Sequence, residues 1–262
     1  MSLDQCFYHF KKWDGCNPEG YSINFLGAKQ KNEYVTMEYP PFNEEYFEWV
    51  DLLESVLQAR EEFVMFELGA GFGRWAVNGA LAARVLGKDY RILAVEPEPQ
   101  HFAWLKANTT ENGLDPDKCE LVEAAVSARE GEADFYVGNP AKWYGQALRR
   151  SQQPLSEEEK KDGVAFQHVK TVTLSKLLGR YDQVDLIDMD IQGSELEVLS
   201  ESQEIFNHSV KRIHIGTHSK ETEQGIRLLL GGLKWKQKWD FECLADRQTP
   251  YGTISFNDGV QG

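Results

Sequence analysis

The stretch that decides the fold is Phe63-Val64-Met65-Phe66-Glu67-Leu68-Gly69-Ala70-Gly71-Phe72-Gly73, an apolar run that ends in an acid and continues into alternate glycines. Its apolar part is too short for a buried helix and is typical of a central strand in a parallel sheet. Glycine at alternate positions lets the backbone turn tightly and approach a ligand, because no Cβ stands in the way. The stretch therefore predicts a strand that leads into a nucleotide-binding turn.

The acid in this stretch narrows the choice of ligand. A carboxylate at the tip of the first strand repels a pyrophosphate, and it suits the ammonium group of an amino-acid-bearing cofactor such as S-adenosylmethionine. Glu67 therefore favours S-adenosylmethionine, held with Gly69, Ala70, Gly71 and Gly73. Because a lone Gly-x-Gly-x-Gly also occurs in ordinary turns, the rest of the chain has to support this hypothesis.

Composition limits the partners and the compartment. The chain has 262 residues, of which 41% are hydrophobic, enough for the core of one large domain. Its 42 acidic and 28 basic residues give a formal charge of −14, which repels phosphate backbones and anionic lipids. We therefore expect neither a nucleic-acid nor a membrane partner. The N-terminus lacks the basic-then-apolar order of a secretion signal, which predicts a cytoplasmic protein of unknown oligomeric state.

The four cysteines do not form a recognisable site. Cys6, Cys16, Cys119 and Cys243 lie far apart and include no Cys-x-x-Cys pair. This spacing indicates neither a zinc site nor a disulfide framework, and we interpret the cysteines as reduced thiols.

Two segments lack periodicity. Residues 1–44 are rich in aromatics, Asn and Gly, and we interpret them as an irregular N-terminal arm and a candidate substrate lid. Residues 45–262 then form the main domain, which starts with an amphipathic helix from Tyr46 to about Arg60. Residues 138–165 are a long aperiodic insertion loop, in which Trp143, Tyr144 and Gln146 are candidates for ligand contact.

The residues after the glycines continue a βαβ pattern. An Ala-rich helix over 75–86 leads to a strand over 91–95, which ends in Glu96-Pro97. An acid at this spacing from the glycine turn can accept both hydroxyls of a ribose. The next strand contains Glu123-Ala124-Ala125, where small side chains can border a flat adenine ring, although simple packing explains them equally well.

Candidate catalytic residues follow two later strands. The strand over 184–190 ends in Asp188 and Asp190, which strand periodicity turns to the same side at the carboxyl edge of the sheet. Open parallel sheets bind ligands at that edge. His218 follows the strand over 211–215, so we expect it to meet the two acids. Residues 234–244 and 251–256 are expected to close the sheet.

The combined motifs resemble the FkbM-type branch of the S-adenosylmethionine-dependent methyltransferases. Acid-x-Gly-Ala-Gly-x-Gly, Val-Glu-Pro, Ala-Ala-Val-Ser and Asp-x-Asp-Ile-Gln-Gly-Ser-Glu-Leu occur in the family's order over residues 62–220. The resemblance implies an α/β fold with a Rossmann-like, seven-stranded, mostly parallel sheet, its last strand antiparallel and helices on both faces. It also implies O-methylation of a hydroxyl on a sugar or small natural product, so that a small molecule or glycan is the acceptor.

Some positions depart from the family pattern. Members usually carry Lys where this chain has Asp188 and Glu where it has Gln192, and Asp is commoner than Glu at position 67. Residue by residue, the match extends to the cofactor loop, the ribose acid Glu96, and the Asp190-x-x-Gly193-x-Glu195 segment. Any role for Asp188 or Gln192 therefore cannot be taken from the resemblance.

Two mechanisms fit these residues. In the first, His218 is the general base and Asp190 orients it or the acceptor hydroxyl, since an unperturbed imidazole titrates near neutral pH. In the second, Asp188, Asp190 and His218 hold a divalent cation that polarises the hydroxyl. Purely structural roles are the alternative to both mechanisms: His218 would cap the next helix, and the acids would form hydrogen bonds with loops. His214 is expected to be packed or exposed.

Two other classes share parts of this pattern. A nicotinamide-dependent dehydrogenase would have the same sheet and ribose acid, but it normally carries Gly-x-Gly-x-x-Gly with no acid before it. A non-catalytic module of the same fold would bind the cofactor without transferring a methyl group. Binding of S-adenosylhomocysteine or of NAD distinguishes a methyltransferase from a dehydrogenase. A methyl-transfer screen distinguishes a methyltransferase from a non-catalytic module.

Overall fold

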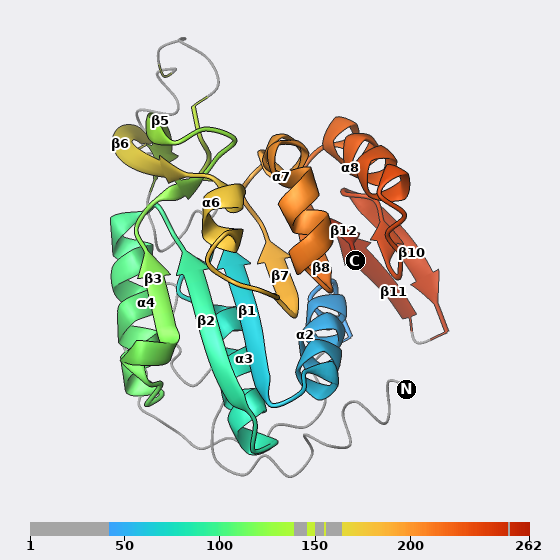
Figure 1. Cartoon of the computed structure of the whole chain (residues 1–262). Coiled ribbons are helices and arrows are strands. Elements are labelled where there is room, and N and C mark those ends of the chain that lie inside the picture. The colour runs from blue at the N-terminus through green and yellow to red at the C-terminus, as the bar shows by residue number, and fades with distance from the viewer. Residues whose placement is uncertain (1–41, 139–145, 150–154, 156–163, 251) are drawn as a thin grey trace.

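A seven-stranded sheet forms the centre of the molecule in the computed structural model, which describes residues 42–138, 146–149, 155, 164–250 and 252–262 (Figure 1). The strands lie in the order β3-β2-β1-β7-β8-β12-β9. Their bounds are β1 Glu62–Leu68, β2 Asp89–Val95, β3 Cys119–Val122, β7 Leu186–Met189, β8 Ile213–Thr217, β9 Asp240–Phe241 and β12 Gly259–Gln261.

The sheet is parallel from β3 to β8 and is interrupted by one reversed strand. β12 pairs antiparallel with both β8 and β9, and it is the last strand of the chain. The fold class expected from the sequence, a Rossmann-like mostly parallel sheet with an antiparallel last strand, is confirmed. The order reverses next to β1, and open α/β sheets bind ligands at such a switch point.

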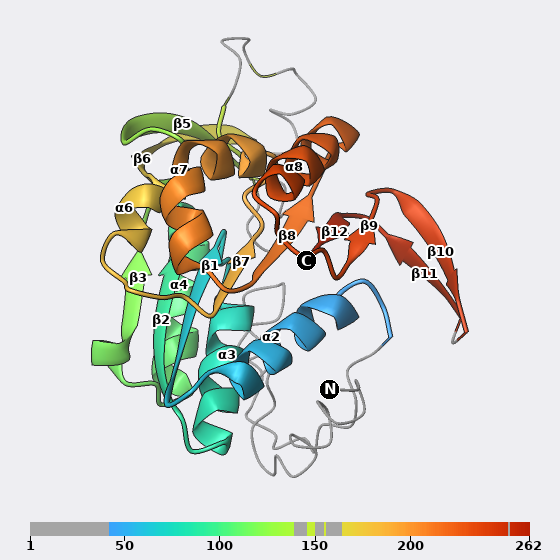
Figure 2. The same cartoon turned by 45° about the vertical axis from the view of Figure 1, so that its right-hand side comes forward.

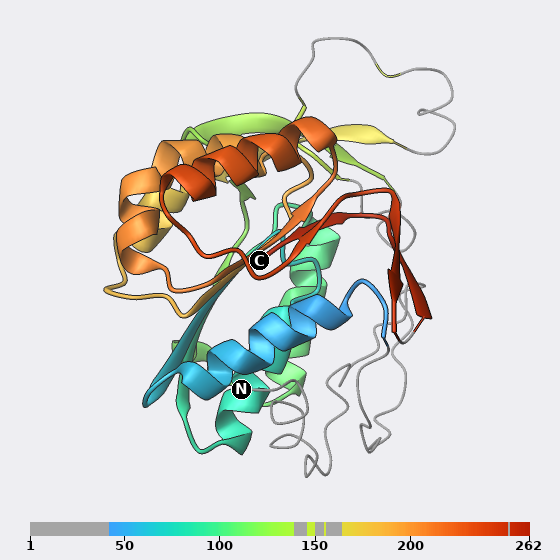
Figure 3. The ribbon, with the colours of Figure 1, turned by 90° about the vertical axis from the view of Figure 1, so that its right-hand side faces the viewer.

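Helices cover both faces of the sheet (Figures 1 and 3). One face carries α2 Tyr46–Gln58, α3 Arg74–Val85 and α4 Pro99–Glu111, and the other carries α6 Leu174–Leu178, α7 Glu195–Ser209 and α8 Lys220–Gly232. A short 3₁₀ turn, η1 Pro116–Lys118, precedes β3. The expected N-terminal amphipathic helix is thus confirmed as α2.

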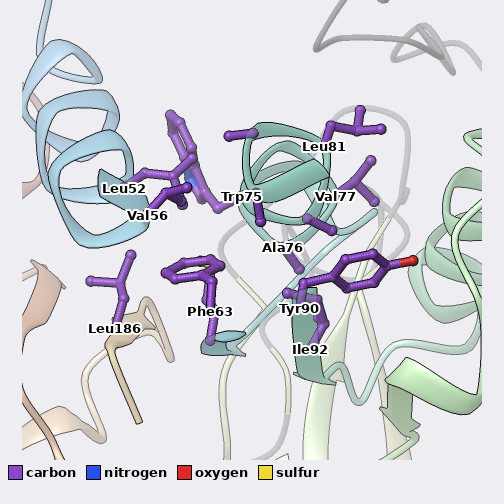
Figure 4. Packing of buried hydrophobic residues seen from close by; sticks show 14 of the residues in the cluster. Leu52, Val56, Phe63, Trp75, Ala76, Val77, Leu81, Tyr90, Ile92 and Leu186 are labelled. Atoms are coloured by element: carbon purple, nitrogen blue, oxygen red, sulfur yellow. The ribbon is translucent and has the colours of Figure 1, made fainter. Parts of the chain in front are cut away.

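The two faces have separate cores, because strand residues alternate between them. Phe63 of β1 is fully buried and points between α2 and α3, where Figure 4 shows it near Leu52 and Val56. Phe66 of the same strand joins the opposite core with Leu199 of α7. This burial on both sides explains why the strand reads as a continuous apolar run.

A second sheet lies beside the carboxyl end of the first three strands. It has the order β4-β6-β5, with β4 Ala125–Val126, β5 Gly131–Val137 and β6 Ala165–Val172. The single strand expected around Glu123-Ala124-Ala125 is divided between the two sheets, as β3 and β4. The division lets the chain leave the central sheet at Glu123.

The prediction for the closing strands was partly wrong. β10 Ala245–Thr249 and β11 Gly252–Phe256 form a separate hairpin that projects from the domain (Figure 2), and the central sheet is closed by β9 and β12. Alternating apolar residues mark 252–256 because Ile254 and Phe256 pack on Phe47 of α2. The closing strands themselves are only two and three residues long, too short for a periodic pattern.

Other predictions lie outside the described residues. These include most of the arm over 1–44 and of the insertion over 138–165, with Trp143 and Tyr144. Among the cysteines, Cys119 and Cys243 are described and both are free. None of the helices in the described part of the chain combines the length and hydropathy that crossing a membrane requires.

Candidate functional site

The glycine turn after β1 depends on backbone conformations that L-residues rarely adopt. Gly69, Gly71 and Gly73 have φ values of 84°, 54° and 79°. A Cβ on Gly69 would collide with the carbonyl oxygen of Asp190, and one on Gly73 would collide with Leu105 of α4. The turn is therefore packed against the end of β7 and against α4, and at both places only glycine fits.

The side chain of Glu67 connects the end of β1 to the start of α3. Its side chain is buried and accepts hydrogen bonds from the backbone N–H groups of Trp75 (3.1 Å) and Ala76 (2.8 Å) in the first turn of α3. Burial raises the pKa of Glu67 to about 8, against the effect of these donors. The carboxyl group thus satisfies the start of α3 and does not face the cleft, so the structure gives no support to a direct contact with a cofactor ammonium group.

Glu96 links the turn to the tip of β2. Its Oε2 accepts a hydrogen bond from Gly71 N–H (2.7 Å) and its Oε1 accepts one from Glu98 N–H (2.8 Å). The residue is buried, which raises its pKa to about 8. Unlike Glu67, Glu96 lines the cleft, so its oxygens can still accept hydrogen bonds from ligand hydroxyls.

A cleft of about 570 Å³, its mouth included, opens between the glycine turn, β2 and the second sheet. It is lined by the predicted residues Gly69, Gly71, Glu96, Pro97, Ala125 and Asp190. Five other residues that were predicted to bind the cofactor do not line the cleft: Glu67, Ala70, Gly73, Glu123 and Ala124. Ala70 and Ala124 belong to the two cores, and the side chain of Glu123 is exposed on the surface.

The second sheet supplies cleft residues that the motifs did not identify. Phe135 of β5 and Leu148 cover one wall, and His101 of α4 lies near Glu96 with 3.9 Å between Nδ1 and Oε1. Gln146, which sequence analysis named as a contact candidate, is buried and its Nε2 has no hydrogen-bond partner in the described structure. An unsatisfied buried donor in an apolar-walled cleft suits a ligand with acceptor atoms, such as an adenine.

The loop after β7 is held by an internal carboxylate. Glu195 is fully buried, and its Oε1 accepts hydrogen bonds from the N–H groups of Ile191 (3.2 Å) and Gly193 (2.8 Å). Gln192 takes a φ of 55° in this turn. The Asp-x-x-Gly-x-Glu segment therefore fixes the loop that presents Asp190 to the cleft.

Asp190 and His218 meet, as the sequence predicted. His218 Nε2 lies 2.8 Å from Asp190 Oδ1, and Nδ1 lies 2.8 Å from Asp258 Oδ1. Burial opposes a charge on the ring, but the hydrogen bonds to both carboxylates raise the pKa of His218 to about 10. Asp258 was not among the predicted residues, because it follows the hairpin that the sequence placed in the sheet.

The surroundings of His218 do not favour the role of general base that was expected of it. A general base needs a free lone pair at the pH of the reaction. With a pKa of about 10, His218 is an imidazolium at neutral pH, and both its N–H groups donate to carboxylates. In this arrangement His218 cannot accept a proton from the acceptor hydroxyl.

Asp188 belongs to a different group. β7 ends at Met189, so the strand alternation that would align Asp188 with Asp190 stops between them. The described residues contain two groups with metal-ligand spacing, Glu48 with Asp188 and His214, and Asp190 with Glu195 and His218. Neither group contains both Asp188 and Asp190, so the predicted metal site of Asp188, Asp190 and His218 is not assembled.

Comparison with known proteins identifies the family. The model of the methyltransferase FkbM domain matches residues 67–241, more than half of the chain. The chain belongs to the FkbM methyltransferase family. A protein of Jannaschia sp. (strain CCS1) that is described as a methyltransferase is 31% identical to this chain over 197 residues. The match covers 74% of this chain and 69% of that protein. The resemblance identified from the motifs is thereby confirmed.

Solved methyltransferase structures are among those similar to this chain. The FkbM methyltransferase of Methylobacillus flagellatus KT gives a TM-score of 0.48 at 11% identity, over 85% of this FkbM chain and 56% of that one. The precorrin-6Y C5,15-methyltransferase of Geobacter metallireducens GS-15 gives 0.45 at 14% identity, over 92% and 96%. Both scores lie below 0.5, and the family assignment depends on the sequence match alone.

Proposed function

We propose that this FkbM-family protein transfers the methyl group of S-adenosylmethionine to a hydroxyl of a sugar or small natural product. One observation carries the proposal: the carboxylate of Asp190 lines the same cleft as the glycine turn and Glu96, and it is held there by His218. Gly69 and Gly71, which line the cleft without side chains, and the unpaired donor of Gln146 fit a bound cofactor. When bound, S-adenosylmethionine supplies a methyl group already activated on sulfur.

Under this proposal Asp190 receives the proton of the acceptor. As the acceptor oxygen gains a methyl group, its O–H bond weakens until even a carboxylate is basic enough to take the proton. Protonated His218 donates to Oδ1 of Asp190, and Gln192 Nε2 donates to the same oxygen (2.9 Å), so that Oδ2 remains for the hydroxyl. The loop fixed by Glu195 keeps this oxygen in place, and alignment is a large part of the catalysis of such a transfer.

The acceptor and its surroundings belong to the same proposal. Residues 1–44 and 138–165 would supply the acceptor pocket, with residues 1–44 as its lid. The acidic surface supports a small molecule or glycan rather than a nucleic acid or membrane, and we place the protein in the cytoplasm.

Two measurements test the proposal. Calorimetry should detect binding of S-adenosylhomocysteine and no binding of NAD, and a methyl-transfer screen over glycans and hydroxylated metabolites should find an acceptor. Binding of NAD without binding of S-adenosylhomocysteine would refute S-adenosylmethionine as the cofactor. Cofactor binding without transfer to any hydroxylated acceptor would instead indicate the non-catalytic module.

A further inference from the structure

Three side chains converge beneath the carboxyl edge of the sheet, next to the candidate active site. Glu48 comes from α2, Asp188 from β7 and His214 from β8, and their oxygen and nitrogen atoms lie within 4.8 Å of one another. Asp188 and His214 are direct neighbours in the β7–β8 register, so both point to the α2 face. The sheet and the helix therefore hold all three groups on rigid elements.

Within the described residues, Asp188 interacts electrostatically with His214 but has no hydrogen-bond donor. It is 7% exposed, and no residue in the described part of the chain donates a hydrogen bond to its carboxyl group. A buried carboxylate without a donor is costly, because it has lost its hydration and gained nothing in return. Its oxygens face Glu48 and His214, so whatever compensates Asp188 has to sit among these residues.

The histidine is oriented as a metal ligand. His214 Nδ1 lies 2.8 Å from Asp51 Oδ2, and this buried pair fixes the ring with Nε2 directed at Glu48, whose Oε1 is 4.0 Å away. Asp51 is itself held by Arg212 (2.9 Å) and by the indole of Trp239 (3.1 Å). A carboxylate that holds one ring nitrogen while the other is left free is the usual second layer of a histidine metal site.

Two of the nearby cations are engaged with other acids. Arg212 and Lys238 form ion pairs with Asp51 and Glu54, so these cations are already matched. Glu48 and Asp188 offer carboxylate oxygens within 4.8 Å of each other, and a divalent cation bound there would offset both charges.

We propose that Glu48, Asp188 and His214 bind a divalent transition-metal cation such as Mn²⁺. Two carboxylates and one imidazole suit this class of ion. The second group, Asp190 with Glu195 and His218, is not a comparable site because both nitrogens of His218 already bind carboxylates. The site does not depend on methyl transfer, since it is defined by residues that the proposed reaction does not use.

The test is direct binding of Mn²⁺ to the full chain after treatment with a chelator. Electron paramagnetic resonance should show one bound Mn²⁺ per chain, with a nitrogen coupling from the imidazole. His214→Asn should abolish the coupling and weaken binding by more than about tenfold, whereas the matched variant His218→Asn should leave both unchanged. Thermal unfolding of each variant verifies that it is folded.

Glu48→Gln provides a second variant if His214→Asn does not fold. Glu48 has a partly exposed side chain on α2, 24% accessible, and its replacement leaves the Asp51–His214 pair intact. It should weaken Mn²⁺ binding to a similar extent. Failure to bind Mn²⁺, binding that all three variants retain, or loss of binding only in His218→Asn would each overturn the proposal.

Discussion

His214 and His218 lie four residues apart at the end of β8, and their surroundings are opposite. His218 lies between two partly exposed carboxylates that occupy both its nitrogens. His214 is buried, and only its Nδ1 has a hydrogen-bonding carboxylate. The comparison teaches that position on a strand does not assign a role to a histidine. The number of its acidic neighbours decides how many of its ring nitrogens are occupied.

The largest effect is expected from the residue beside His218. Asp190→Asn removes the proton acceptor while keeping the size of the side chain, so methyl transfer should fall by about 10²- to 10⁴-fold. Affinity for S-adenosylhomocysteine, measured by calorimetry, should change little, because Gly69, Glu96 and Gln146 are untouched. A variant with near wild-type turnover would exclude Asp190 as the acceptor of the proton.

The partners of the two histidines should differ in their contribution to stability. Asp51→Asn breaks a buried network with His214 and Arg212, and it should lower the free energy of unfolding by about 3–5 kcal/mol. Asp258→Asn removes a carboxylate whose side chain is 49% accessible, and it should cost less than about 1 kcal/mol. Denaturant unfolding of both variants measures the contrast, and equal losses would contradict it.

His218→Gln should reduce turnover by only about tenfold, since it removes a positioning group rather than the proton acceptor. The pH profile separates the two roles. If His218 acts as a cation, wild-type kcat should stay level between pH 7 and 9, below its pKa of about 10. A rate that rises with pH over this range and loses the rise in His218→Gln would restore His218 as the general base.

The smallest effect concerns stability against pH. The folded pKa of His218, about 10, lies above its ordinary value of 6.5, so the folded state favours the proton. The stabilisation is therefore complete below pH 6.5 and is lost as the pH rises towards 10. The difference in unfolding free energy between wild type and His218→Gln should shrink over this window, and high salt should reduce it throughout. A difference that grows with pH would contradict the assignment.

The part of the cleft around the glycine turn was largely predictable from the sequence. Gly69 and Gly71 can be recognised because a tight turn requires glycine. Glu96 can be recognised because it lies at a characteristic spacing from these glycines in a βαβ unit. What the motif could not show is the direction of Glu67, which faces α3 instead of the cleft. A carboxyl group at a strand tip can satisfy helix N–H groups as well as a ligand, and only the packing decides.

The two histidine clusters could not be predicted in the same way, because they are built from side chains that are distant in sequence. Asp51 and His214 are 163 residues apart, and Asp258 reaches His218 only through the hairpin that precedes it. Strand alternation grouped Asp188 with Asp190, and the end of β7 separated them. Tertiary contacts of this kind leave no periodic pattern in the chain.

The reversed strand β12 has a consequence for the order of folding. Residues 259–261 lie between β8 and β9, so the central sheet cannot close until this late segment has been synthesised. Until then β8 is an edge strand, and its unpaired backbone groups can recruit other strands. Asp258 directly precedes β12, so its contact with His218 forms late, together with the pairing of β12 on β8.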